Sequence, residues 1–434
     1  MVSPLYEREQ AVLAATQRLR FFPLTVVAGE GCWLVEEGGR RLLDLSASWA
    51  IASLGYGHPA IQAAVARAMS QMAGVGLVST CNVEAVQLAE ALLACTPGTG
   101  ERRVYLGHSG SDANEAAVRT IRHSTGRSGV IAFHGSYHGG LAGSSQFSGL
   151  IVDAGGHPDS DLSLLPYPSG PSAAETARAA LDQLDTLLDQ QGENIAALIC
   201  EPLMSDGGVI VPPPGFLADV HKRLSSAGVL LICDEVKVGL GRTGTLHAFE
   251  HDGITPDVVT FGKSLGGGLP VSAVVGPAHV FDTAEAFTML GTAGNPVTAA
   301  AAHAVLRTVI DENLPAEAAA RGAQLRAGLT QLKSEHPAIE DIRGRGLSLG
   351  MQLGTTCDGR NSPSSTAAKV CYRAWELGLV LYPVGPDADI LEMTPPLIIS
   401  PAEVDQALAL LAQALTDVEM GAVSDETVSR FQGW

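Results

Sequence analysis

Short apolar runs and helical stretches alternate through the central part of the chain, from about residue 100 to about residue 280. The runs are rich in β-branched residues and predict strands over 103–106, 129–133, 196–200, 229–233, 258–260 and 271–275. Strands that are apolar on both faces and alternate with helices are typical of a parallel sheet covered by helices on both sides. The central segment therefore predicts the large domain of an α/β protein.

The flanking parts of the chain predict smaller elements. Alternating runs at 24–27, 32–35 and 41–45, separated by glycine-rich turns, predict a small N-terminal meander. Helical patterns are present over 59–74, 82–94, 296–334 and 401–415, and strand patterns over 347–353 and 390–393. We expect residues 1–58 and 311–434 to form a small α+β domain beside a large domain of residues 59–310, which contains a mainly parallel seven-stranded type of sheet.

Composition narrows the class of partner. The chain has 434 residues, of which 46% are hydrophobic, so it can bury a large core. Lys and Arg number 27 against 46 Asp and Glu, which gives a net charge of −19. Because nucleic acids and anionic membranes repel such an acidic protein, we expect neither as a partner and expect a small-molecule ligand instead.

The cysteines and the N-terminus indicate the compartment. Seven cysteines lie singly along the chain, without the paired spacing of a zinc site or of a disulfide framework. The first twenty residues are interrupted by charged side chains and contain no apolar stretch of the length of a signal peptide. The longer uncharged runs, at 128–152 and 287–306, contain glycine and polar residues unsuited to a membrane span. The sequence therefore predicts a cytoplasmic protein without a metal site.

The strand predicted over 229–233 ends in two carboxylates, Asp234 and Glu235. Ligands of open α/β sheets bind beyond the carboxyl ends of the strands, so a functional acid is expected at this position. A structural role for Asp234, as a cap of the following turn or as the partner of a buried arginine, fits the position equally well.

The strand predicted over 258–260 leads to Lys263, which is followed by Ser-Leu-Gly-Gly-Gly. A lysine crowded by backbone loses part of its hydration, which lowers its pKa and makes it a nucleophile toward a carbonyl group. The alternative is a solvated surface lysine, the commoner case for a lone lysine. The spacing between Asp234 and Lys263 fits one crossover between neighbouring strand ends.

A third segment, His108-Ser-Gly-Ser-Asp-Ala-Asn-Glu115, is a turn of small residues before a predicted helix. Free N–H groups at such a helix start bind anions, and Gly110, next to Ser111, would let a phosphate approach closely. A helix N-cap with a capping box is equally consistent with these residues. Together with an acid, a lysine and the aromatic ring of Tyr137, a phosphate site completes the set of groups that binds pyridoxal 5′-phosphate (PLP).

These motifs resemble the class-III aminotransferases, a family of fold-type-I PLP-dependent transferases. The resemblance includes Asp234-Glu-Val-Lys-Val-Gly239, Gly262-Lys263-Ser, Glu201-Pro202, Gly294-Asn-Pro296 and Pro395-Pro396 and covers nearly the whole chain. It implies that Lys263 forms the Schiff base with PLP, that Asp234 contacts the ring nitrogen, and that Val236 and Tyr137 lie on opposite ring faces. It also implies a homodimer with active sites at the interface.

Two positions depart from the aminotransferase pattern. Lys237 stands where the family usually has a glutamine on the phenolic oxygen of the cofactor, and Glu392 stands where many members have an arginine. An arginine there would hold a substrate carboxylate in a bidentate fork, whereas a glutamate would repel it. A substrate whose carboxylate is masked as an amide fits better. The alternative for Glu392 is a place outside the pocket, paired with a base such as Lys237.

Within the family, the sequence is similar to racemases of α-amino-ε-caprolactam. The similarity includes Phe21-Phe-Pro-Leu24, Trp49, Ser205-Asp206-Gly-Gly208 and the terminal Phe431-Gln-Gly-Trp434. It implies that Trp49 and Tyr137 line the substrate pocket, although core packing explains Trp49 equally well. The family's phosphate-binding threonine, supplied by the partner subunit, usually lies one residue further from the following asparagine than Thr292 does, so Thr292 departs from the pattern.

The resemblance implies a PLP-dependent racemase that inverts the α-carbon of α-amino-ε-caprolactam or of amino acid amides through a quinonoid intermediate. Lys263 would remove the α-proton, and Asp206 would act as the second acid/base on the opposite face. For Asp206 the alternative is a turn residue before two glycines. The rival functions are an ω-aminotransferase, a racemase of free amino acids, and a PLP-binding protein that has lost catalysis.

Overall fold

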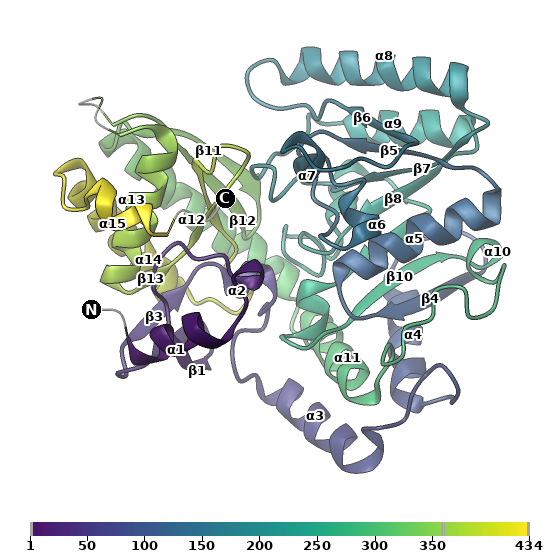
Figure 1. Cartoon of the computed structure of the whole chain (residues 1–434), viewed down its shortest axis with the longest axis horizontal. Coiled ribbons are helices and arrows are strands. Elements are labelled where there is room, and N and C mark those ends of the chain that lie inside the picture. Colours follow the sequence, from purple (N-terminus) through teal and green to yellow (C-terminus); the bar gives the residue numbers. More distant parts are fainter. Residues whose placement is uncertain (1–2, 357–358, 360, 432–434) are drawn as a thin grey trace. The chain divides into compact units, whose positions relative to one another are not determined.

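The computed structural model describes residues 3–356, 359 and 361–431. Cys357 and the last three residues of the Phe431-Gln-Gly-Trp434 motif lie outside this range. The chain divides into a small unit, residues 1–58 with 317–434, and a large unit, residues 59–316 (Figure 1). The division after residue 310 expected from the sequence falls at the end of helix α11 (Pro296–Asp311), and the large unit continues to Ala316.

The large unit contains a seven-stranded sheet with the strand order β4-β10-β9-β8-β7-β5-β6. The strands β6, β5, β7, β8 and β9 pair in parallel, as the sequence predicts for most of the sheet. The bounds are β4 (Arg102–Gly107), β5 (Gly129–Phe133), β6 (Leu162–Leu165), β7 (Ile195–Cys200), β8 (Leu230–Asp234), β9 (Val258–Phe261) and β10 (Ser272–Pro277).

Strand β10 departs from the expected parallel arrangement, because it runs antiparallel to both β4 and β9. Only the short 3-10 helix η3 (Lys263–Gly266) and a glycine-rich turn separate it from β9. A parallel neighbour requires a crossover of about a dozen residues or more, so this short connection returns the chain in the opposite direction.

Both faces of the large sheet are buried. Alternate residues of β5 belong to different hydrophobic clusters: Ile131 and Phe133 pack on one face, Val130 and Ala132 on the other. Helices on the two faces supply the remaining core, and Figure 1 shows α8 and α9 beyond one part of the sheet. The main helices are α3 (Pro59–Met72), α4 (Val83–Cys95), α5 (Gly110–Thr125), α8 (Ala173–Gln191), α9 (Phe216–Ser226) and α11 (Pro296–Asp311).

The small unit contains two four-stranded sheets, with the orders β1-β2-β3-β13 and β11-β12-β15-β14. Their strands are β1 (Val26–Glu30), β2 (Trp33–Glu36), β3 (Arg41–Asp44), β11 (Ile339–Arg345), β12 (Ser348–Leu353), β13 (Leu379–Val380), β14 (Tyr382–Val384) and β15 (Ile390–Met393). The single helical section predicted over 296–334 is two helices, α11 and α12 (Leu314–Glu335). Helix α11 belongs to the large unit, and most of α12 to the small unit, whose further long helices are α13 (Pro363–Leu377) and α14 (Pro401–Glu419).

Short helical elements complete the fold. They are α1 (Pro4–Val12), α2 (Ala47–Ala50), α6 (Ala142–Ser145), α7 (Gly149–Asp153), α10 (Ala278–Phe281), α15 (Asp425–Ser429), η1 (Ala15–Gln17) and η2 (Ala248–Asp252). Among the residues that the structure describes, no helix combines the length and the apolar character needed to span a lipid bilayer.

Candidate active site

The carboxyl ends of β7, β8 and β9 bring the chemically important residues of the large unit together. Because the three strands are parallel neighbours, Glu201 after β7, Asp234 at the end of β8 and Lys263 after β9 lie at the same edge of the sheet. The sequence-based expectation that Asp234 and Lys263 follow neighbouring strands is confirmed. Ligands of open α/β sheets bind at this edge.

Asp234 is 3% exposed and is held by hydrogen bonds on both oxygens. Its Oδ2 accepts the Nδ2–H of Asn114 at 2.7 Å and the Nδ1–H of His138 at 2.8 Å. Its Oδ1 accepts the backbone N–H of Val236 at 3.0 Å. Within the large unit its partners are therefore an amide, an imidazole and a backbone N–H, rather than the buried arginine considered from the sequence, and they fix the orientation of the carboxylate.

Asn114 and His138 contact Asp234 in the candidate site, and the sequence did not single them out. Asn114 is 1% exposed on α5, and its Oδ1 accepts the hydroxyl of Thr260 on β9 at 2.7 Å. His138 is also 1% exposed, and its carbonyl accepts a second hydrogen bond from Asn114. Asn114 belongs to the 108–115 segment, and a polar residue on the apolar face of the predicted helix was the available signal for it. His138 directly follows Tyr137, and its position next to this aromatic residue was the only signal in the sequence.

Lys263 begins η3 with a backbone φ of 37°. A residue other than glycine in the left-handed region costs about 1–3 kcal/mol, a strain that persists mainly at functional sites. The Nζ of Lys263 lies 3.9 Å from Oδ2 of Asp206, and its side chain is 21% exposed. Lys263 is therefore not the solvated surface lysine of the alternative interpretation.

Asp206 lies between two lysines. The Nζ of Lys237 is 2.5 Å from Oδ1 of Asp206, so the carboxylate faces Lys237 on one side and Lys263 on the other. Burial favours the neutral form of Asp206, but the two ammonium groups outweigh it and hold the pKa of this carboxyl below its usual value. Asp206 is thus a buried, charged group within reach of Lys263. It also lies in the turn before Gly207 and Gly208, as the alternative interpretation of a turn residue expects.

The start of α5 carries Gly110 and Ser111. The capping box is complete: the hydroxyl of Ser109 accepts the N–H of Asp112, whose carboxylate accepts the N–H of Ser109. The N–H groups of Gly110 and Ser111 belong to the first turn, ahead of the hydrogen-bond ladder of the helix. Both interpretations of this segment are therefore compatible, since the cap leaves the helix start able to bind an anion.

Val236 packs directly against the start of this helix. A Cβ built on Gly110 would lie 2.5 Å from Cγ1 of Val236, and a Cβ on Gly262 would lie 3.0 Å from the backbone nitrogen of Gly110. The absence of side chains at these two glycines lets Val236, the helix start and the residue before Lys263 approach one another.

Tyr137 is half-buried in the segment that follows β5. Its phenol has a raised pKa, chiefly because of burial and then because of the negative charge of Asp206. The hydroxyl of Ser111 accepts the N–H of Gly140 at 3.2 Å, which ties this segment to the helix start. Tyr137, Ser111 and Asp206 thus belong to one neighbourhood of the large unit.

Thr292 lies near the same helix start in its own chain. Its Oγ1 is 2.8 Å from Nε2 of His108, two residues before Gly110. A contact of Thr292 with the phosphate in a partner subunit stays a prediction.

Trp49 belongs to the small unit, in the four-residue turn α2. All four residues have positive φ values, between 45° and 64°, so the turn is left-handed. Its ring stacks on Tyr382 with the centroids 5.0 Å apart, and the residue is half-buried. Aromatic packing of Trp49 is therefore present within this unit, and a role in the substrate pocket stays a prediction.

Glu392 lies in the middle of β15, where it is 3% exposed. Its backbone pairs with Gly350 of β12 and Tyr382 of β14. Burial of a carboxylate in a strand core is costly, so this position is consistent with a specific function for Glu392.

The residues of the large unit fit PLP. A carboxylate held on both oxygens suits a protonated pyridine nitrogen, and the glycine-lined helix start suits a phosphate. Asp234 would contact the ring nitrogen, Gly110 and Ser111 the phosphate, Val236 and Tyr137 the ring faces, and Lys263 the aldehyde carbon.

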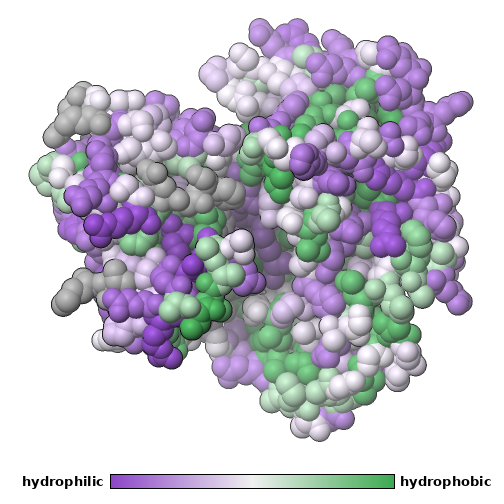
Figure 2. Space-filling view, in the orientation of Figure 1, coloured by the Kyte–Doolittle hydropathy of each residue, from purple (hydrophilic) through white to green (hydrophobic). Residues whose placement is uncertain are grey.

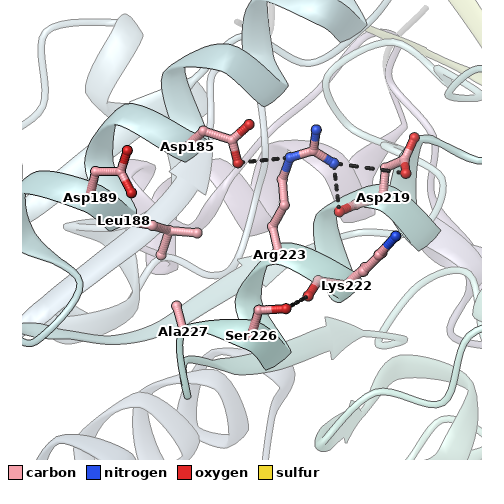
Figure 3. Close-up of a pocket in the computed structure, with 8 residues that line it drawn as sticks. All are labelled: Asp185, Leu188, Asp189, Asp219, Lys222, Arg223, Ser226 and Ala227. Carbon is pink, nitrogen blue, oxygen red and sulfur yellow. Dashed lines mark hydrogen bonds and ion pairs between the residues drawn. The ribbon is translucent and has the colours of Figure 1, made fainter.

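A separate surface pocket lies between α8 and α9 (Figure 3). Its central Arg223 binds Asp185 at 2.9 Å and the carbonyl of Asp219 at 3.2 Å. None of the site residues predicted from the sequence lines this pocket, and its arginine is engaged by acidic neighbours, so we do not assign the reaction to it.

Comparisons with known proteins agree with the site. The model of the family "Aminotransferase class-III" matches residues 14–415. Alanine/serine racemase of Pyrococcus horikoshii is 32% identical over 441 residues, which cover 98% of this chain and 92% of that protein. Leucine/methionine racemase of Thermococcus litoralis is 33% identical over 446 residues, covering 99% of each.

Other relatives have other activities. Acetylornithine aminotransferase of Mycobacterium bovis is 37% identical over 410 residues, covering 92% of this chain and 93% of that protein. A solved structure of a phospholyase from Arthrobacter, in complex with phosphoethanolamine, matches with a TM-score of 0.85, 31% identity, and coverage of 95% of this chain and 99% of that one. The chain is an enzyme that belongs to the class-III aminotransferase family, with the fold-type-I architecture and the PLP dependence of that family.

Proposed function

We propose that this enzyme is a racemase that inverts the α-carbon of amino acid amides, including the cyclic amide α-amino-ε-caprolactam. The observation that carries the proposal is the placement of Asp206 between Lys237 and Lys263. Inversion requires one group to take the α-proton and a second group to return a proton on the opposite face. A buried carboxylate within 3.9 Å of Lys263 supplies the second group.

In this reaction the carboxylate of Asp206 removes the α-proton of one enantiomer, and the ammonium group of Lys263 gives a proton to the other face, so that one proton is taken up and one is returned. For the reverse direction the two residues exchange roles. Bound PLP supplies the electron sink that makes the α-proton acidic. Asp234, oriented by His138 and Asn114, would contact the ring nitrogen of the bound cofactor.

The proposed substrate class rests on two residues that depart from the aminotransferase pattern. The buried Glu392 stands where many members carry an arginine, and a carboxylate there would repel a substrate carboxylate. Lys237, which would contact the phenolic oxygen of PLP in the family arrangement, binds Asp206 in this chain. The charge of Glu392 therefore favours a neutral amide over a free amino acid.

Two other functions have support from relatives. The alanine/serine and leucine/methionine racemases favour inversion, but their names refer to free amino acids. The acetylornithine aminotransferase favours transamination, in which the proton goes to the cofactor and a keto product leaves. The placement of Asp206 favours a racemase over an aminotransferase, and Glu392 favours amides over free acids.

We also propose a homodimer with active sites at its interface. Figure 2 shows hydrophobic residues on the surface of the large unit around α3 and α4. The exposed apolar side chains there include Met69, Val78, Val83 and Val86. Monomeric proteins rarely leave several large apolar side chains exposed in one region, so a second copy of the chain is the partner that we expect.

The substrate class is tested by offering the PLP-loaded enzyme single enantiomers of α-amino-ε-caprolactam, of a linear amino acid amide and of the corresponding free amino acid. We expect loss of optical activity with the lactam and the amide at a higher kcat/KM than with the free acid. A higher kcat/KM for the free acid would contradict the amide assignment and favour the function of the racemase relatives.

A further inference from the structure

Glu201 joins the two loops that carry Tyr137 and Asp206. This glutamate follows β7 and is 4% exposed. Its Oε1 accepts the backbone N–H of Tyr137 at 3.0 Å, and its Oε2 accepts the backbone N–H of Ser205, next to Asp206, at 3.0 Å. One buried carboxylate therefore bridges two segments that are far apart in the sequence.

The second loop is a tight hairpin, residues 204–210, which we call the Asp206 hairpin. Met204 and Ile210 form an antiparallel bridge at its base, with N···O distances of 3.0 and 2.7 Å. At its tip, Gly207 lies against the first loop: a Cβ on Gly207 would be 2.4 Å from the carbonyl oxygen of Gly135. The hairpin thus has a second contact with the segment that carries Tyr137, independent of Glu201.

We propose that Glu201 is a positioning residue that sets where Asp206 stands relative to Tyr137 and Lys263; this rests on the proposed racemase function. Glu201 does not exchange the α-proton. It holds the Asp206 hairpin in register with the Tyr137 segment, and so fixes the distance over which Asp206 reaches the α-carbon. A displacement of about 1 Å in an acid/base group is enough to reduce proton transfer strongly.

The two hydrogen bonds are stronger with an ionised carboxylate, because protonation turns one oxygen into an O–H donor and reduces its acceptor capacity. Burial, together with the negative charges of Asp234 and Asp206 and against the effect of His138, raises the pKa of Glu201 to about 7. The test is therefore made above this pH, where the ionised form of Glu201 predominates.

The test compares two rates in D₂O, with the PLP-loaded enzyme and each enantiomer of an amino acid amide. NMR follows exchange of the α-proton for deuterium, and chiral chromatography follows inversion. Removal and return of a proton by Lys263 alone gives exchange with retention, whereas inversion also needs Asp206.

In Glu201→Gln, one end of the side chain becomes an N–H donor that cannot accept from a backbone N–H. We expect inversion to fall about tenfold or more relative to exchange for at least one enantiomer, within the range that a single acid/base group contributes. Gly207→Ala, whose Cβ would push the hairpin tip away from Gly135, should give the same signature without touching Glu201. It keeps the test decisive if Glu201→Gln does not fold.

Glu235→Gln is the matched control. Glu235 is 1% exposed, and its two oxygens accept the N–H groups of Ala248 and Phe249 at 2.8 and 2.9 Å, a segment without predicted site residues. If Glu235→Gln lowers activity, we expect the rates of exchange and of inversion to fall by the same factor. If exchange and inversion also fall by the same factor in Glu201→Gln and Gly207→Ala, the positioning role of Glu201 is contradicted. If the unmodified enzyme shows no inversion, the racemase function itself is contradicted.

Discussion

The Nζ of Lys237 lies 2.5 Å from Oδ1 of Asp206, a buried ion pair at the carboxyl edge of the large sheet. Lys263 approaches the other oxygen of the same carboxylate at 3.9 Å. Because burial alone would favour a neutral carboxyl, Asp206 keeps its charge through these lysines. Lys237 therefore controls the protonation state of the group to which we assign the second proton transfer.

Lys237→Met should move the acidic limb of the kcat/KM profile for racemisation to higher pH. Removal of the ammonium group takes away a positive charge that opposes the effect of burial, so the pKa of Asp206 rises. The profile is measured beside that of Lys222→Met, which removes an exposed lysine of α9. An acidic limb that stays at the same pH in Lys237→Met would show that Asp206 does not limit this step.

Lys263→Ala should abolish racemisation and the absorbance of the lysine-bound cofactor. Lys263 follows β9 at the edge of the sheet where the predicted cofactor residues meet, and its strained backbone directs it to a defined place. Turnover is measured with a linear amide, and the absorbance is recorded after reconstitution with PLP. Residual turnover within about tenfold of the unmodified enzyme would contradict the assignment, since loss of a Schiff-base lysine should cost far more.

Asp234→Asn should retain PLP but slow racemisation by roughly a hundredfold, the order of magnitude of a lost electrostatic contact to a developing charge. The amide can still make neutral hydrogen bonds with Asn114 and Val236, so the site keeps its shape. It no longer stabilises a protonated ring nitrogen. PLP content and kcat are both measured; an unchanged kcat with full PLP content would remove Asp234 from the chemistry.

Gly110→Ala should weaken retention of PLP. The added Cβ would meet Cγ1 of Val236 at 2.5 Å, so either the helix start or Val236 must move. Overpacking of this kind costs about 1–3 kcal/mol. The rate of PLP release is compared with that of Gly74→Ala, where an added Cβ meets nothing within 4 Å. Equal release rates in the two variants would contradict a phosphate site at this turn.

Glu392→Arg should improve kcat/KM for free amino acids relative to amides. A guanidinium at this position offers a bidentate partner to a substrate carboxylate, a change of roughly 1 kcal/mol or more if it reaches the substrate. Glu392→Gln is measured beside it, because it removes the negative charge with little change in volume at a residue that is 3% exposed. For Glu392→Gln we expect a smaller rise in the ratio of kcat/KM for free amino acids to kcat/KM for amides. A constant ratio in both folded, PLP-loaded variants would exclude Glu392 from substrate selection.

Most of the large sheet could be predicted from apolar runs. The strand expected over 129–133 coincides with β5, and those expected over 196–200 and 258–260 differ from β7 and β9 by one residue. Strand β6 was missed because Leu162–Leu165 is a short edge strand, three of whose four residues are only half-buried, so its pattern is weaker. The reversed direction of β10 depends on the length of its connection to β9 rather than on its own composition.

The candidate site could be predicted only in part. Strand-end positions and motifs indicate Asp234 and Lys263, because a polar residue that directly follows an apolar strand is visible in the sequence. The sequence does not reveal the ion pair of Lys237 with Asp206 or the two hydrogen bonds accepted by Glu201. The residues that make these contacts belong to different loops. Hydrogen-bond partners across loops depend on tertiary packing, which periodicity does not report.

The central claim is that the enzyme racemises its substrate rather than transaminating it. The most direct measurement incubates PLP-loaded enzyme with one enantiomer of α-amino-ε-caprolactam in the absence of any keto acid, and follows both optical purity and keto product. We predict many turnovers per active site that end in a racemic mixture, without keto product. Retention of optical purity, with at most one equivalent of keto product per active site, would contradict the account and identify an aminotransferase.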